Sequence, residues 1–154
     1  EKEKNLKSIQ SIAQLAFISI YIISGLDYRF HWSNIPLIIS FTGDFFVVLG
    51  LLIVFLVFKE NTYTSAIIEV DEDQKVISSG PYRFVRHPMY SGALLMMLFT
   101  PVALGSSWAL AGVFFLAYVI VLRLLDEERF LTEHLSGYSE YCRKVSFHLI
   151  PYIW

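Results

Sequence analysis

The chain has 154 residues, of which 55% are hydrophobic, and its formal net charge is −2. This hydrophobic share exceeds the roughly 45–50% of an ordinary soluble domain, and the apolar residues gather in long runs, so the composition indicates an integral membrane protein. The net charge gives no reason to expect nucleic-acid binding. A single cysteine, Cys142, excludes an intrachain disulfide and a cysteine-based zinc site.

Four apolar runs predict the fold, at residues 9–26, 35–58, 89–104 and 108–125. The connections between the first and second runs and between the third and fourth are short, as is typical of antiparallel neighbouring helices. The third run is short for a bilayer, which needs about 20 residues, and Pro101 interrupts it. We therefore expect an all-α integral membrane bundle of about four transmembrane helices, forming a single domain over residues 1–154.

Two polar segments complete the predicted fold. Residues 67–70 and 76–77 flank an acidic turn, which predicts a small hairpin outside the bilayer. Beyond residue 125 the helical pattern continues to about residue 135, where Gly137 can end the helix, so a cytoplasmic helical extension is expected at the C-terminus. Within the second run, Asp44 should face the bundle, because a carboxylate facing lipid costs at least about 2.5 kcal/mol. Its expected role is a hydrogen bond to a neighbouring helix, and the alternative is a contact with the substrate.

The distribution of basic residues predicts the orientation in the membrane. With four spans, the lysines and arginines outside the spans lie on one side, and only Arg29 lies on the other. By the positive-inside rule, both termini and the predicted hairpin are cytoplasmic. In a prokaryote this membrane would be the plasma or inner membrane.

The stretch of residues 80–92 carries the first candidate site. Pro88 favours the first turn of a helix and an extended conformation at His87, so the imidazole is expected at a helix N-terminus, which favours an anion. Tyr82 and Tyr90 can line this place, and Gly92 would let a ligand approach the backbone. The alternative interpretation is a basic, aromatic membrane anchor.

A second cluster lies where the fourth span ends, with Arg123, Glu127 and Glu128. Antiparallel third and fourth spans bring these acids to the same membrane side as Arg86 and His87. Aromatic faces, helix-terminal N–H groups and carboxylates suit a nucleoside that bears a carboxylate and a positive charge. The alternative is a solvated acidic cluster. No metal is expected, because the four histidines have no ligand-like spacing.

Together, the two clusters resemble the isoprenylcysteine carboxyl methyltransferase family, whose pattern phospholipid N-methyltransferases largely share. The resemblance implies an integral membrane enzyme that binds S-adenosylmethionine at the cytoplasmic face and methylates a lipophilic acceptor: an isoprenylcysteine-type carboxylate, a lipid amine or a small hydrophobic molecule. The residues expected to bind the cofactor are Tyr82, Arg86, His87, Pro88, Tyr90, Gly92, Glu127 and Glu128.

The catalytic roles depend on the acceptor. A carboxylate acceptor needs a cation to hold it, for which Arg86 and Arg123 are the candidates. An amine or thiol acceptor needs deprotonation, for which Glu127 and His87 are the candidates. Residues 141–152 also resemble the C-terminus of sterol reductases, which use NADPH. A membrane reductase and a non-catalytic membrane module therefore remain as alternatives.

Overall fold

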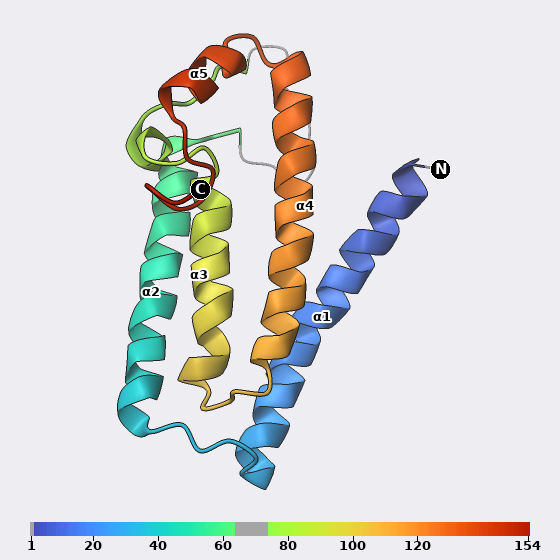
Figure 1. The fold of residues 1–154 in the computed structure, drawn as a ribbon, viewed down its shortest axis with the longest axis vertical. Coiled ribbons are helices and arrows are strands. Elements are labelled where there is room, and N and C mark those ends of the chain that lie inside the picture. The colour runs from blue at the N-terminus through green and yellow to red at the C-terminus, as the bar shows by residue number, and fades with distance from the viewer. Residues whose placement is uncertain (1, 64–73) are drawn as a thin grey trace. The chain divides into compact units, whose positions relative to one another are not determined.

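The computed structural model describes residues 2–63 and 74–154, with side chains from residue 14 onward. In chain order the elements are α1 (Lys2–Phe30), α2 (Leu37–Glu60), the 3-10 turn η1 (Gly80–Arg83), α3 (Pro88–Ala103), α4 (Leu110–His134) and α5 (Tyr138–Lys144) (Figure 1). The part of the chain that is described contains no strand, so the predicted all-α class is confirmed.

The predicted hairpin is not confirmed. Its first arm and its acidic turn fall within residues 64–73, which lie outside the described residues. Its second arm, Val76 and Ile77, is irregular rather than extended into a strand. The C-terminal extension is helical as predicted, since α4 runs to His134 and α5 follows after Gly137.

One helix of the described part, α2, is long and apolar enough to cross a membrane, with a mean hydropathy of 2.5 over its most apolar stretch. Only 17% of that stretch is buried by the protein, so α2 is not a core helix of the kind found inside soluble proteins. Helix α3 is apolar but has 16 residues, with Pro101 inside its last turn. The four-span membrane bundle stays a prediction.

The chain forms two compact units. Unit 1 contains Glu1–Leu49 and Leu94–Val121, and unit 2 contains Gly50–Ala93 and Leu122–Trp154. The boundaries fall inside α2, α3 and α4, so each of these helices contributes to both units. The single domain expected over residues 1–154 stays a prediction.

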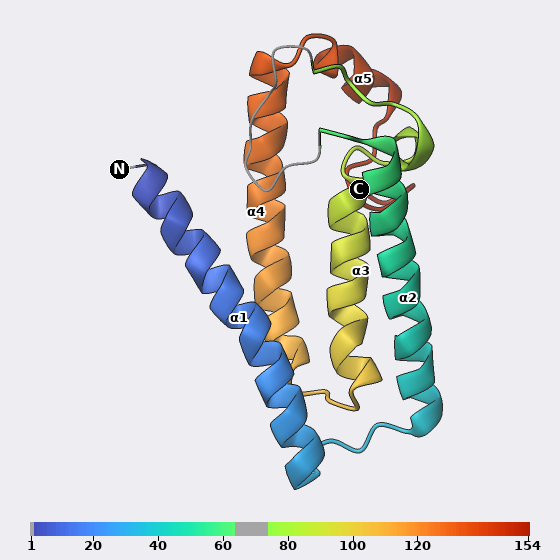
Figure 2. The same ribbon diagram turned by 180° about the vertical axis from the view of Figure 1, so that it is seen from behind.

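In unit 1, α1 packs against α4, and α2 packs against α3. Ile20 belongs to the buried cluster that includes Val113 and Leu116. Phe46 stacks on Phe99 with ring centroids 4.3 Å apart. Between α3 and α4 the chain reverses direction through a short turn, which both ribbon views show (Figures 1 and 2).

A buried carboxylate, Asp27, holds the loops of unit 1 together. Its side chain is 0% exposed. Ser33, between α1 and α2, donates to Asp27 Oδ1 from its backbone N–H and to Oδ2 from its hydroxyl, both at 2.6 Å. Ser106, in the turn between α3 and α4, donates from its hydroxyl to Oδ2 at 2.5 Å. Asp27 therefore ties the end of α1 to two separate loops.

The prediction for the other acid of unit 1 was wrong. Asp44 is exposed rather than turned towards a neighbouring helix, and no hydrogen bond of its side chain occurs among the described residues. The structural role expected for Asp44 belongs instead to Asp27, which lies near the end of α1.

Unit 2 is built around the C-terminal segment. Tyr138, Tyr141 and Val145 form a buried cluster with Leu135. The turn from α4 into α5 depends on Gly137, whose φ of 84° is strained for other residues. Two backbone hydrogen bonds join the residues before α3 to the C-terminal segment. The Arg86 N–H donates to the Phe147 carbonyl at 2.8 Å, and the His87 N–H donates to the His148 carbonyl at 3.0 Å.

Replacing Asp27 with Ala is expected to destabilise unit 1, because the buried Ser106 hydroxyl loses its acceptor. A hydrogen bond to a charged group contributes about 1.5–3 kcal/mol, which corresponds to a fall in Tm of about 3–12 °C for a chain of this size. Tryptophan fluorescence of the purified protein during heating measures the change. The matched control is Asp44→Ala, which should stay within about 2 °C of the parent. Equal losses in the two variants would contradict the role assigned to Asp27.

Candidate active site

Arg86 uses its whole guanidinium to join three parts of unit 2. Its Nε donates to the Val145 carbonyl at 2.6 Å, and its Nη2 donates to the Cys142 carbonyl at 3.0 Å. Its Nη1 donates to Glu128 Oε1 at 2.6 Å. Because Cys142 lies in α5, Val145 directly follows it and Glu128 lies on α4, one side chain fixes both helices against the start of α3. Burial lowers the pKa of Arg86, but the hydrogen bond to Glu128 and nearby negative charges raise it overall.

The Glu128 carboxylate lies within 4.0 Å of three basic side chains, those of Arg86, His87 and His148, and the Glu128 side chain is 15% exposed. Its Oε2 lies 2.9 Å from Nε2 of His148, in addition to the bond that Arg86 makes to Oε1. Burial raises the pKa of the Glu128 carboxyl, but the neighbouring His87, the hydrogen bond from Arg86 and the charge of His148 outweigh burial and lower the pKa from 4.5 to about 2. Glu128 is therefore ionised at neutral pH.

The contacts of His148 indicate its tautomer. A carboxylate only accepts hydrogen bonds, so the 2.9 Å contact with Glu128 requires a proton on His148 Nε2. The 3.3 Å contact between the same nitrogen and Arg86 Nη1 is then a close approach of two donors rather than a bond. Trp154 stacks on the imidazole, with centroids 4.8 Å apart. The C-terminal residue thus supports the histidine that contacts Glu128.

His87 lies at the N-terminus of α3, as predicted, because Pro88 is the first residue of that helix. The residue is 5% exposed, and its Nε2 has no hydrogen-bond partner among the described residues. The nearest carboxylate oxygen, Glu128 Oε1, lies 3.9 Å away, too far for a hydrogen bond. A buried polar atom without a partner is costly and uncommon in folded proteins, so this nitrogen marks a place where a ligand atom would be stabilising.

A second chain of contacts joins α3 to α4. The Tyr90 hydroxyl donates to Glu127 Oε2 at 2.5 Å, and Arg123 Nε donates to the same hydroxyl oxygen at 3.2 Å. Tyr90 therefore bridges a cation and a carboxylate that lie one turn apart on α4. Glu127 and Glu128 face different partners, as their adjacent positions on a helix require.

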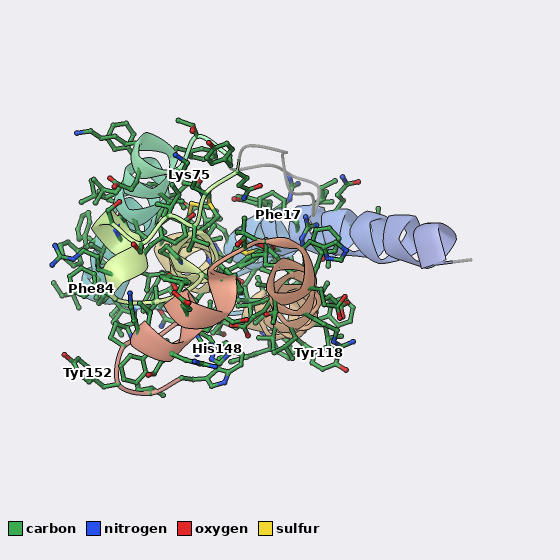
Figure 3. The ribbon with its side chains drawn as sticks, turned by 90° about the horizontal axis from the view of Figure 1, so that it is seen from above. Phe17, Lys75, Phe84, Tyr118, His148 and Tyr152 are labelled. Carbon is green, nitrogen blue, oxygen red and sulfur yellow. The ribbon has the colours of Figure 1, made fainter. Side chains whose placement is uncertain are left out.

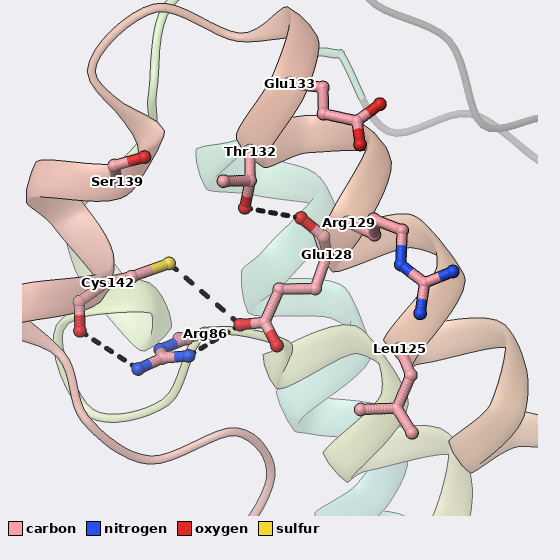
Figure 4. Close-up of a pocket in the computed structure, with 8 residues that line it drawn as sticks. All are labelled: Arg86, Leu125, Glu128, Arg129, Thr132, Glu133, Ser139 and Cys142. Carbon is pink, nitrogen blue, oxygen red and sulfur yellow. Dashed lines mark hydrogen bonds and ion pairs between the residues drawn. The ribbon is translucent and has the colours of Figure 1, made fainter.

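A cavity of about 440 Å³ opens beside Glu128 (Figure 4). The close-up shows the Glu128 carboxylate directed towards Arg86 and Cys142, with the Arg129 guanidinium turned away from it. The lining residues are Arg86, Leu125, Glu128, Arg129, Thr132, Glu133, Ser139 and Cys142. Four of the lining residues are charged, and the other four are small polar or apolar residues.

Two of the residues predicted for the site, Arg86 and Glu128, line this cavity. His87, Tyr90 and Glu127 do not line it, and two further predicted residues are used differently. The Tyr82 hydroxyl accepts a hydrogen bond from Asn61 Nδ2 at 2.8 Å. The Tyr82 side chain packs against the buried cluster that contains Tyr138 and Tyr141, and it does not line the cavity. A Cβ at Gly92 would lie 2.9 Å from the Gly50 carbonyl oxygen. The close approach that Gly92 permits is therefore that of α2, not that of a ligand.

Sequence reasoning missed His148, Cys142 and Val145. Two of them serve Arg86 through backbone carbonyls, which no side-chain pattern reveals. The signal that was available is the resemblance of residues 141–152 to the C-terminus of sterol reductases. Among the described residues, no group of three or more His, Cys, Asp or Glu side chains is arranged to hold a metal ion.

Comparisons with known proteins show the family of this chain. A family model described as phospholipid methyltransferase matches residues 38–137. Methanethiol S-methyltransferase of Crocosphaera subtropica is 29% identical over 142 residues, which cover 92% of this chain and 49% of that protein. A probable protein-S-isoprenylcysteine O-methyltransferase of Oryza sativa subsp. indica is 29% identical over 120 residues, which cover 75% of this chain and 62% of the relative.

A third relative belongs to another class. The Delta(14)-sterol reductase of Mus musculus is 31% identical over 84 residues, which cover 53% of this chain and 20% of the reductase. This chain spans about half the length of the Crocosphaera relative. The family match extends over well more than half of the chain and includes Arg86, His87, Glu127 and Glu128. On this basis, the chain belongs to the phospholipid methyltransferase family, a family of methyltransferases.

Proposed function

We propose that this protein transfers a methyl group from S-adenosylmethionine to a lipophilic acceptor at the cytoplasmic face of a membrane. The observation that carries the proposal is the arrangement around Glu128 in a member of a methyltransferase family. Glu128 is an ionised carboxylate that lines a cavity, and the buried His87 nitrogen, which has no hydrogen-bond partner among the described residues, lies 3.9 Å from it.

The residues present fit such a cofactor. The cavity volume of about 440 Å³ lies within the range of roughly 300–1,000 Å³ that is usual for small-molecule sites. A nucleoside with an ammonium group offers donors and positive charge to Glu128, and a polar atom for the unsatisfied Nε2 of His87. Arg129, exposed at the rim, offers a cation for a carboxylate. We propose that His87, Glu127 and Glu128 hold the cofactor, with Pro88 and Tyr90 shaping the site.

Arg86 is better explained as a residue that positions other groups than as a residue that binds the methyl acceptor. Its Nε, Nη1 and Nη2 all donate to groups of the protein, so it holds Glu128 and the C-terminal segment in place. Precise placement of reacting groups contributes much of the rate in a transfer that needs no covalent enzyme intermediate. His148 supports the same carboxylate from its other side.

When bound, S-adenosylmethionine supplies a methyl group on a positively charged sulfur. For an amine or thiol acceptor, Glu127 is the base we propose, because its carboxylate accepts a bond from Tyr90 and is available to take a proton. For a carboxylate acceptor no base is needed, and Arg123, which contacts Tyr90, is the cation we propose to hold it. The names of the relatives cover both chemistries, a thiol and an isoprenylcysteine carboxylate.

We also propose that the chain is a multi-pass membrane protein, with one methyltransferase domain over residues 1–154 and both termini cytoplasmic. The exposed apolar surface of α2 and the concentration of lysines and arginines outside the expected spans on one side support this topology.

Methyl transfer itself is tested with membranes that contain the protein and S-adenosylmethionine carrying an isotopically labelled methyl group. A lipophilic product that gains the labelled methyl group is expected, found by mass spectrometry of the extracted lipids and small molecules. Membranes with the Glu127→Gln variant are the control and should form much less product. Equal product in both samples would mean that the label enters through another enzyme.

Binding measurements by calorimetry test the proposed cofactor residues with S-adenosylhomocysteine. Removing a charge-assisted hydrogen bond costs about 1.5–3 kcal/mol, so Glu128→Gln should raise Kd roughly tenfold to hundredfold. His87→Ala should have an effect of similar size, and the double variant should lose less than the sum, because both residues contact one ligand. Glu140→Gln removes an exposed carboxylate on α5 and is the matched control.

The reductase is the second candidate, because of the similarity to Delta(14)-sterol reductase. The same calorimetric series with NADPH distinguishes the two. Binding of NADPH that Glu128→Gln and His87→Ala both impair, with no response to S-adenosylhomocysteine, would replace the methyltransferase proposal. Unchanged S-adenosylhomocysteine binding in both variants would place the cofactor elsewhere.

The lowered pKa of Glu128 predicts how stability depends on pH. Because the pKa falls from 4.5 to about 2 on folding, the ionised carboxylate stabilises the folded state above pH 4.5, and this stabilisation is lost as the pH falls towards 2. Glu128→Gln cannot ionise, so its Tm should lie below that of the parent near neutral pH, and the difference should shrink on acidification. Glu140→Gln should show no such convergence. A difference that is constant with pH would contradict the ion-pair role of Glu128.

A further inference from the structure

A second cavity of unit 2, of about 470 Å³, lies between the last turns of α2 and the η1 turn. It is lined by Ile53, Leu56, Lys59, Glu60, Gly80, Pro81, Arg83 and Phe84. None of these residues lines the cavity beside Glu128. The proposed methyl transfer therefore leaves this cavity without a role.

Part of the lining of this second cavity is apolar and exposed. Phe84 is 65% exposed and lies at the outside of unit 2 beside η1 (Figure 3). Leu56 is also exposed, and Ile53 completes the apolar wall. A large aromatic side chain next to exposed aliphatic groups is unfavourable in water and suits contact with hydrocarbon.

The other end of the cavity is cationic. Lys59 and Arg83 are both exposed, and neither makes an ion pair within residues 2–63 and 74–154. The carboxylate of Glu60 opposes them, but it accepts a hydrogen bond from the Ser79 hydroxyl and packs against Gly80. The remaining balance of two cations against one carboxylate favours an anion.

The place of these groups along α2 matters. Helix α2 is apolar from Phe45 to Phe58 and then ends in Lys59 and Glu60. The cavity therefore spans the point at which hydrocarbon-compatible side chains give way to cations. A molecule with the same order of chemistry, an apolar chain attached to a negatively charged phosphate, complements both ends.

We propose that this cavity binds one anionic glycerophospholipid. Its phosphate lies against Lys59 and Arg83, and an acyl chain lies along Ile53, Leu56 and Phe84. The lipid is a bound component of the protein rather than a methyl acceptor, because this cavity shares no lining residue with the cavity beside Glu128. This site is additional to the proposed cofactor site and does not depend on it.

Native mass spectrometry of the purified full chain in detergent tests the proposal by counting bound dioleoyl phosphatidylglycerol or dioleoyl phosphatidylcholine. These lipids share their acyl chains, so the difference reports the headgroup. The parent should retain phosphatidylglycerol much more tightly. Each cation near an anionic headgroup is worth about fivefold in affinity, so Lys59→Gln/Arg83→Gln should weaken phosphatidylglycerol binding by about 30-fold.

Arg143→Gln/Lys144→Gln is the matched control, because it removes two exposed cations from α5. It should change binding of phosphatidylglycerol by less than about twofold. Phe84→Ser should weaken binding of both lipids, and glycerol 3-phosphate should not displace phosphatidylglycerol, since it lacks the acyl chains. Equal retention of the two lipids by the parent would overturn the proposal. So would equal losses in the two double variants, or displacement by glycerol 3-phosphate.

Discussion

The contacts of Arg86 hold unit 2 together. One guanidinium donates to the Glu128 carboxylate and to two carbonyls in and directly after α5, so it joins the start of α3 to α4 and to the C-terminal segment. A lysine carries a charge but lacks the planar fork that reaches three acceptors at once. Because a buried carboxylate without its partner is strongly destabilising, the position of Glu128 depends on this arginine. The cavity and the candidate site follow from the same contact.

The buried Asp27 and the partly buried Glu128 differ in their surroundings, and this explains their different roles. Asp27 is enclosed by serine donors and joins loops, so its bonds are satisfied within the protein. Glu128 is held by Arg86 and His148, yet it borders a cavity and a His87 nitrogen that has no partner among the described residues. A carboxylate that is fully used by the protein stabilises structure. A carboxylate beside an unsatisfied polar atom suits recognition of a ligand.

The relatives named for methanethiol and for protein-S-isoprenylcysteine are equally similar to this chain, at 29% identity each. The similarity therefore does not select one acceptor. The cofactor site that we propose at Glu128 and His87 is compatible with both chemistries, because none of its contacts depends on the acceptor.

The sequence by itself determined the all-helical class, the approximate limits of the helices and the pairing of residues 86–90 with residues 123–128. These depend on local rules: long apolar runs, proline at a helix start, and antiparallel neighbours after a short turn. Only the tertiary structure decided what each polar group meets. It turned Asp44 outward and buried Asp27, assigned Gly92 to a contact with α2, and placed His148 against Glu128. The physical reason is that these outcomes depend on backbone carbonyls, loop hydroxyls and residues distant in sequence, whose positions no local pattern specifies.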